Sequence, residues 1–199
     1  KPIFCIANAR AGFEGERAIA KTSSPKKVMV IGSGPGGLEA AVCAAEAGHR
    51  VELYEKADRI GGQLWIAGTP PHKHEVWELI AYYDAMLDKY DIEVNLEHEV
   101  TMDFIKEKKS DHVFVAEGAE PLKPRIDGID DPKVVSAWDV LADDPMLGRN
   151  IAIIGGGAVG LETAEFLAVK GTLTPEAMHF LFMYEGETPE RLRDLCTRG

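Results

Sequence analysis

The chain has few cysteines, no long apolar stretch and no excess of positive charge. Only three of its 199 residues are cysteines, and no two of them form a C-x-x-C pair. This disfavours a disulfide framework and a dithiol mechanism. Apolar runs such as 28–31 and 151–154 are the length of a strand, far short of the roughly 20 residues that cross a membrane as a helix. The formal net charge of −11 argues against a nucleic-acid partner, because binding phosphates requires a basic surface.

The sequence also lacks an initial methionine and the apolar core of a secretion signal. We therefore expect a cytoplasmic protein with neither a membrane nor a nucleic acid as partner, and a chain that is a piece of a longer protein.

A glycine pattern, Gly32-x-Gly34-x-x-Gly37, follows a predicted strand at 27–31 and opens a predicted helix. By itself this pattern is weak, since glycine-rich turns occur in many α/β proteins. The flanking elements give it meaning: the first glycine permits a tight turn, the second admits a pyrophosphate, and the third lets helix and strand pack closely. Glu55 ends the next predicted strand, 50–55, where a carboxylate can accept hydrogen bonds from a ribose. The first motif therefore predicts a dinucleotide site.

The pattern occurs again at Gly155, Gly157 and Gly160, after a predicted strand at 150–154. The residue that would bind the adenosine ribose should end the next strand, but 174–184 and 188–196 each begin Thr-Pro-Glu, a helix-start signature. We predict two helices there. An alternative stays open, in which 179–185 is the missing strand and Glu185 the ribose acid.

The remaining pattern alternates between helix and strand. A helix is predicted at 76–90, a strand at 92–100, a short helix at 102–109 and a strand at 111–118. This order predicts an α/β fold with a Rossmann-like, doubly wound parallel sheet. We expect a linker over 1–24, a first dinucleotide domain over 25–148, and a second, truncated dinucleotide domain over 149–199.

Several stretches together resemble one flavoprotein family. They are "VMVIGSGPGGLEAA", "VELYEKADRIGGQL", "VFVAEGAEP", "IDGIDDPKVVSAWDVL" and "IGGGAVGLETAEFLA", preceded by "FCIANARAGFEGE". The chain resembles the FAD- and NAD(P)H-binding region of the NADH:flavin oxidoreductases related to 2,4-dienoyl-CoA reductase, 2-enoate reductase and trimethylamine dehydrogenase. In that family an N-terminal barrel carries FMN and a [4Fe-4S] cluster. The resemblance implies FAD on the first motif and NADH or NADPH on the second.

The resemblance also implies site residues. Lys73 is a weaker candidate for a phosphate contact, and Glu117 departs from the family, which has a small hydroxyl residue there. Val100 would offer backbone groups to the adenine. FAD contacts are expected at Gly32, Gly34, Gly36, Gly37, Glu55, Lys56, Gly62, Gln63, Val100 and Gly118, and NAD(P)H contacts at Gly155, Gly157 and Gly160.

The implied function is electron input from NAD(P)H through FAD toward the cluster and FMN, for reduction of an enoate or enoyl-CoA type of substrate in the barrel. Cys5 matches the last cluster ligand of the family, and no catalytic acid or base is expected in this chain. We expect the chain to be inactive alone and the full-length protein to be a possible homo-oligomer. Two alternatives remain: an electron-transfer module like the glutamate synthase small subunit, and a catalytically silent FAD-binding module.

Other residues have simpler interpretations. His72 and His74 are expected on a loop surface rather than at a metal, and Cys43 is expected as a small thiol inside a helix. Cys196 is given no role. The tryptophans are expected to anchor the core or an interface; they are Trp65, Trp77 and Trp138.

Overall fold

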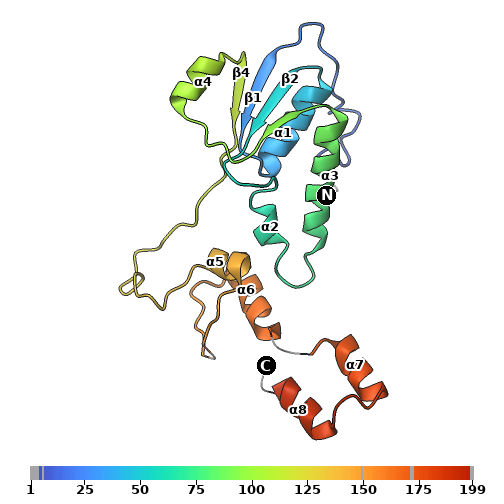
Figure 1. Ribbon diagram of the computed structural model, residues 1–199, viewed down its shortest axis with the longest axis vertical. Helices are drawn as coiled ribbons and strands as arrows, with labels where there is room; N and C mark the ends of the chain where they lie inside the picture. The colour runs from blue at the N-terminus through green and yellow to red at the C-terminus, as the bar shows by residue number, and fades with distance from the viewer. Residues whose placement is uncertain (1–4, 6, 149, 171–172, 198–199) are drawn as a thin grey trace. The chain divides into compact units, whose positions relative to one another are not determined.

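A computed structural model describes residues 5, 7–148, 150–170 and 173–197, without the side chains of 194–197 (Figure 1). The chain divides into two compact units, Lys1–Gly68 with Lys73–Pro124, and Thr69–His72 with Arg125–Gly199. The predicted boundary at 148/149 therefore differs from the observed one. Residues 125–148 group with the second unit because α5 (Ala137–Asp143) packs against α6 (Ala158–Val169).

The first unit is built on a parallel sheet whose strand order is β3-β2-β1-β4. The sequence order runs outward from β1 to β3, and the chain then crosses to place β4 on the other side of β1. In sheets of this kind ligands bind at the carboxyl edge where the order reverses, here between β1 and β4. The strands are β1 (Lys27–Ile31), β2 (Arg50–Tyr54), β3 (Glu93–Asn95) and β4 (His112–Val115).

The third strand is shorter than the predicted 92–100. Beyond Asn95 the chain turns, and Glu97 takes a left-handed conformation with φ of 53°. Its N–H then bonds to the carbonyl of Ala57 at 2.9 Å, while the N–H of His98 bonds to the carbonyl of Glu55 at 2.8 Å. The segment after β3 thus folds against the end of β2 instead of extending the ladder.

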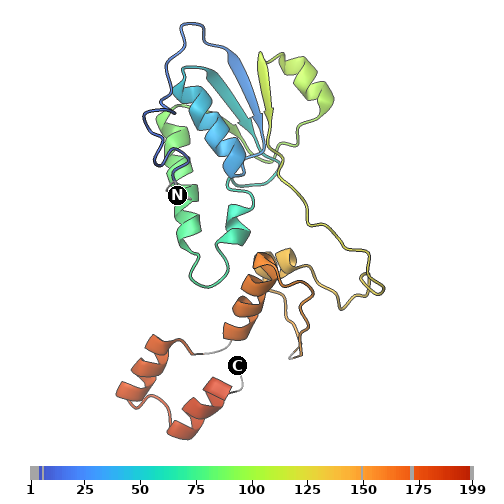
Figure 2. The same ribbon diagram turned by 180° about the vertical axis from the view of Figure 1, so that it is seen from behind.

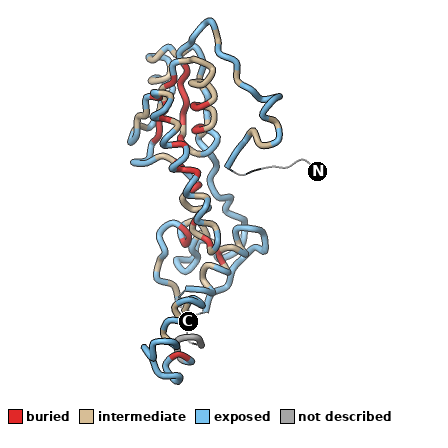
Figure 3. Tube along the Cα trace, turned by 90° about the vertical axis from the view of Figure 1, so that its right-hand side faces the viewer, coloured by how far each residue is buried: buried red, intermediate tan, exposed pale blue. Residues whose placement is uncertain are grey.

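Helices cover both faces of this sheet. On one face α1 (Pro35–Glu46) and α3 (Glu75–Lys89) enclose the main core, and the short α2 (Leu64–Ala67) leads into α3. On the other face α4 (Met102–Lys108) packs through Phe104 and Ile105 against Met29 and Tyr54. In both front and back views α4 lies beside β4 (Figures 1 and 2). Buried residues gather along the strands and the helices packed on them (Figure 3).

In the described part of the second unit, four helices are joined by turns and irregular chain. Besides α5 and α6 it contains α7 (Pro175–Met183) and α8 (Pro189–Thr197), which confirms the two predicted helices. The hydroxyl of Thr174 accepts from the N–H of Ala177, and that of Thr188 from the N–H of Arg191. The predicted strand at 150–154 is wrong: within the described residues after 124 no segment is a strand, so an extended 151–154 has no ladder partner.

Two further points concern segments outside the sheet. Residues 8–17, predicted as part of a linker, form consecutive turns that belong to the first unit. Across the described residues, no helix combines the length and the apolar character needed to cross a membrane.

Candidate dinucleotide-binding sites

The first glycine turn requires glycine at two positions for steric reasons. Gly32 has φ of +95°, and a Cβ there would lie 2.3 Å from the carbonyl oxygen of Ala116 at the end of β4. A Cβ on Gly37 would lie 1.9 Å from the carbonyl oxygen of Gly32. No side chain fits at such distances, so these two glycines build the turn.

The other two glycines of the turn face open space. A Cβ on Gly34 or Gly36 would meet nothing within 4 Å. Gly34 is the N-cap of α1, with ordinary extended angles of −66° and 176° and no side-chain capping bond. Free N–H groups at a helix N-terminus, beside an unobstructed backbone, form a site that favours phosphates. The turn therefore fits the pyrophosphate predicted for it.

Glu55 lies beside this turn and holds it. One carboxylate oxygen, Oε2, accepts from both the N–H and the Oγ–H of Ser33 at 2.7 Å, and Oε1 accepts from the N–H of Ala57 at 2.9 Å. Burial raises the pKa of Glu55, but the hydrogen bonds from Ala57 and Ser33 outweigh it, so the net pKa is below its ordinary value. The carboxylate is thus ionised and oriented at the end of β2.

Sequence reasoning missed Ser33. It is fully buried, and it occupies the variable position between the first two glycines. The signal that could have identified Ser33 is a small hydroxyl residue between the first two glycines, combined with an acid predicted at the end of the next strand.

Two more segments meet the glycine turn at the carboxyl edge of the sheet. A Cβ on Gly62, which has φ of +51°, would lie 3.0 Å from the Cα of Gly34. Gln63 donates from Nε2 to the carbonyl of Ala119 at 2.9 Å, and a Cβ on Gly118 would lie 3.4 Å from that same Nε2. The loops after β1, β2 and β4 are therefore brought together.

Three more predicted contacts lie after β2, after β3 and before α3. Lys56 is exposed, directly after Glu55, and Val100 is half-buried against the cluster that contains Tyr54. Lys73 is half-buried, two residues before α3. Glu117 is exposed, two residues after the end of β4, with its Cα 3.3 Å from the Cβ position of Gly32.

Tryptophans support the loop after β2. Trp65 donates from Nε1 to the carbonyl of Ile60 at 2.8 Å, and Trp77 donates from Nε1 to the carbonyl of Trp65 at 3.1 Å. The guanidinium of Arg59 lies 4.5 Å from the ring centre of Trp65. These contacts tie residues 59–65 to α3 and agree with the structural role expected for Trp65 and Trp77. Trp138 is half-buried in α5.

The second glycine turn repeats the local geometry of the first. Gly155 has φ of +112°, and a Cβ on Gly160 would lie 2.0 Å from the carbonyl oxygen of Gly155. Gly157 caps α6 at −78° and −178°, matching Gly34. The surroundings differ, because a Cβ on Gly155 would meet nothing within 4 Å. The turn is encoded locally, without the neighbouring strand that encloses Gly32.

The alternative for the missing ribose acid is wrong in this structure. Residues 179–183 are helical, and Glu185 follows α7 with φ of 49° rather than ending a strand.

The described residues do not form a metal centre. Cys5 is exposed, and across the described residues no three or more histidine, cysteine, aspartate or glutamate side chains gather in a way that could hold an ion. His72 and His74 are exposed, as expected. Cys43 is half-buried in α1 and donates to Glu39 at 3.3 Å. The side chain of Cys196 lies outside the described residues.

The comparison with known families settles what these two turns belong to. A family model described as pyridine nucleotide-disulphide oxidoreductase matches residues 26–191, both glycine turns included. The chain belongs to this family. Its domains bind FAD and NAD(P), so the α/β Rossmann-like fold and the oxidoreductase class are confirmed.

Three similar proteins place the chain within that family. A metal reductase of Desulforamulus reducens is 40% identical over 203 residues, covering 100% of this chain and 30% of its own length. A cinnamate reductase of Clostridium sporogenes is 38% identical over 169 residues, covering 85% of this chain and 25% of its own. The solved structure of a 2-naphthoyl-CoA reductase complex has a TM-score of 0.79 at 34% identity, covering 96% of this chain and 30% of that one.

These likenesses confirm the predicted resemblance to the FAD/NAD(P)-binding region of 2-enoate-reductase-like flavoproteins. The chain spans less than a third of the length of these relatives. The substrates of the full-length relatives are therefore properties of those proteins. The alignment with the metal reductase extends over the α7–α8 segment as well, because it includes the entire chain.

Proposed function

We propose that the chain is the electron-input part of an NAD(P)H-dependent flavin oxidoreductase, with FAD on the first glycine turn and NAD(P)H on the second. The observation that carries this is the repetition of one turn geometry at Gly32–Gly37 and Gly155–Gly160. Each turn ends in an uncapped helix N-terminus with open space beside it. When bound, FAD accepts a hydride from the nicotinamide and passes electrons on singly or in pairs.

The chain's own residues position the cofactor and perform no proton chemistry in this proposal. The turn supplies backbone N–H groups to the pyrophosphate, and Glu55 presents a fixed carboxylate to the ribose hydroxyls. Gln63 is held beside the junction by Ala119. All three features lie at the reversal point of the sheet, where a dinucleotide binds in folds of this type.

The finer proposal is that electrons continue to an iron–sulfur cluster and FMN, for reduction of an enoate or enoyl-CoA type of substrate. It is supported by the family resemblance and by relatives named for cinnamate and 2-naphthoyl-CoA. The residues of this chain do not fit a cluster by themselves, because a [4Fe-4S] cluster takes four cysteine thiolates and the chain has three cysteines, Cys5, Cys43 and Cys196.

Flavin binding tests the first proposal. Apo-protein of full length is titrated with FAD while flavin fluorescence is followed, and NADH or NADPH is then added under anaerobic conditions. Stoichiometric quenching followed by bleaching of the flavin absorbance is expected. Absence of FAD binding contradicts the proposal. For the finer one, Cys5→Ala in the full-length protein should lower iron content while FAD is retained; an unchanged iron content contradicts the assignment of Cys5.

A further inference from the structure

The N-terminal segment 8–17 is a folded strap, not an open connector. Its turns are closed by backbone bonds from the N–H of Phe13 to the carbonyl of Arg10 at 2.8 Å and from the N–H of Arg17 to the carbonyl of Phe13 at 2.8 Å. The guanidinium of Arg17 lies 4.3 Å from the ring centre of Phe13 and donates to the carbonyl of Ala9 at 2.8 Å. These bonds give the segment a defined shape.

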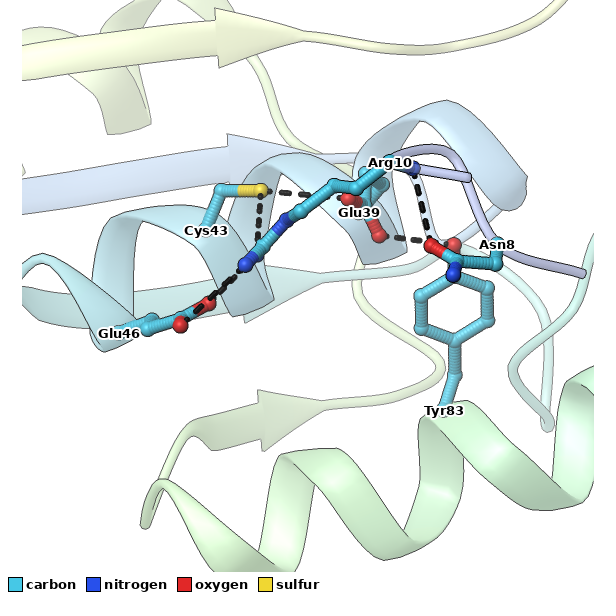
Figure 4. Close-up of polar contacts among 6 residues, drawn as sticks. All are labelled: Asn8, Arg10, Glu39, Cys43, Glu46 and Tyr83. Atoms are coloured by element: carbon cyan, nitrogen blue, oxygen red, sulfur yellow. Dashed lines mark hydrogen bonds and ion pairs between the residues drawn. The ribbon is translucent and has the colours of Figure 1, made fainter. Parts of the chain in front are cut away.

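Arg10 attaches this strap to α1. Its Nη2 and Nη1 donate to the two carboxylate oxygens of Glu46 at 2.5 and 3.3 Å, and Nη2 also lies 3.7 Å from the Sγ of Cys43 (Figure 4). Each charged side chain is only 27% exposed. The hydrogen bond from Arg10 lowers the pKa of Glu46. Bidentate arginine–carboxylate pairs fix geometry as well as charge.

The contact continues from α1 into α3. The thiol of Cys43 donates to Oε1 of Glu39 at 3.3 Å, and the hydroxyl of Tyr83, which is 6% exposed, donates to Oε2 of Glu39 at 3.0 Å (Figure 4). Arg10 is therefore the first member of a polar chain that runs through Cys43 and Glu39 to a buried residue of α3. Within the described residues, this chain joins the strap to two helices that enclose the main core.

The Arg10–Glu46 pair connects different parts of the fold from two other ion pairs in the described part of the first unit. Lys106 and Asp103 are neighbours on α4, 70% and 93% exposed. Lys108 and Glu52 join α4 to the sheet. The pair Arg10–Glu46 spans 36 positions and fastens a segment that has no strand or helix of its own.

We infer that Arg10 is a positioning residue that clamps the strap to the outer face of α1, so that the strap and the dinucleotide-binding unit move as one body. The consequence, which rests on the proposed function, is that the strap gives the N-terminal side of the full-length protein a fixed attachment point on the unit that binds FAD. The rate of electron transfer between the FAD site and a redox centre on that N-terminal side depends on the distance between them. A flexible linker would leave this distance uncontrolled.

Hydrogen exchange of the full-length protein tests the clamp. In Arg10→Met the amides of Phe13 and Arg17 should exchange roughly fivefold faster, the effect of losing a partly buried ion pair. The variant Glu46→Gln should do the same from the other partner, and the charge reversal Arg10→Glu with Glu46→Arg should restore part of the protection. Lys106→Met, which removes an exposed pair on α4, is the matched control and should leave these amides unchanged.

Small-angle scattering of the same proteins tests the consequence. The radius of gyration of the full-length protein should increase in Arg10→Met and decrease again in the charge reversal. Unchanged exchange at Phe13 and Arg17 in both single variants overturns the clamp. Faster exchange with an unchanged radius of gyration overturns the inference that the clamp holds the preceding part. A wild type that binds no FAD would instead overturn the proposed function, while the exchange measurement would still decide the clamp.

Discussion

Ser33 and Glu55, 22 positions apart, are joined by two hydrogen bonds to a single carboxylate oxygen. Glu55, the residue proposed to bind the ribose, therefore also shapes the glycine turn. Glu55 has a structural role as well as the proposed role of ligand contact, because removing its carboxylate leaves the N–H groups of Ser33 and Ala57 without their acceptor.

The coupling between these two residues can be measured. Ser33→Ala removes the hydroxyl bond and keeps the backbone bond, so it should lower the free energy of unfolding by roughly 1–2 kcal/mol. Glu55→Gln should have a similar effect on stability, and the double variant should cost less than the sum. Urea denaturation of all four proteins gives the coupling energy. Strict additivity would mean that the two side chains act independently.

The glycines separate folding from cofactor binding. Gly37→Ala places a Cβ 1.9 Å from a backbone oxygen and should destabilise the first unit by about 2 kcal/mol or more. Gly34→Ala meets nothing within 4 Å, so it should keep its thermal midpoint and bind FAD at least about tenfold more weakly, a loss of about 1.4 kcal/mol. Gly15→Ala, also in open space, is the control for FAD affinity. Full FAD affinity in Gly34→Ala contradicts the pyrophosphate assignment.

The sequence predicted both turns, the four strands of the sheet and most of the helices, because these leave local signals: glycine at a left-handed φ, threonine caps, and apolar periodicity. It predicted neither α2 nor α5, two of the shorter helices. It did not predict that residues 8–17 fold onto α1, since Arg10, Cys43 and Glu46 meet only through tertiary contact. The strand expected at 150–154 shows that a correct local pattern is not sufficient for a strand. Its residues have the apolar pattern of a strand, but a strand exists only when a neighbour completes its ladder.

Acid should destabilise the first unit. The pKa values of Glu46, Glu52 and Glu55 are all below the ordinary value of 4.5, so the folded state holds these groups ionised more strongly than the unfolded state does. Their contribution is present above pH 4.5 and is lost as the pH falls through the folded-state values. Denaturation midpoints measured downward from pH 7 should decrease below about pH 4.5, less steeply in Glu46→Gln. A rising midpoint in this range contradicts the sign.

Glu117 should weaken the binding of FAD. Glu117 is exposed, two residues after the end of β4, and its Cα lies 3.3 Å from the Cβ position of Gly32 in the turn that would hold a dianionic pyrophosphate. Glu117→Gln should therefore bind FAD up to about fivefold more tightly at low ionic strength, and the gain should shrink as salt is added. Glu120→Gln, which removes a charge from an exposed residue three positions on, should give less than half of this gain. Equal effects of the two variants would assign the change to net charge alone.

The second turn should serve the nicotinamide dinucleotide independently of FAD. A Cβ on Gly157 meets nothing within 4 Å and its φ is −78°, so Gly157→Ala should fold normally in the full-length protein. It should retain FAD at the wild-type stoichiometry, yet raise the KM for NADH or NADPH at least about tenfold, because the new methyl group occupies the approach of the pyrophosphate. Gly156→Ala lies in the same turn, also in open space, at the position that Ser33 fills in the first turn. It should leave this KM unchanged.

Flavin content reports on the first turn, and the rate of flavin bleaching by NAD(P)H reports on the second. Gly34→Ala should therefore lower the flavin content, whereas Gly157→Ala should lower the rate of bleaching. Loss of FAD in Gly157→Ala, or an unaltered KM in it, would show that the repeated geometry does not divide the two cofactors between the two turns.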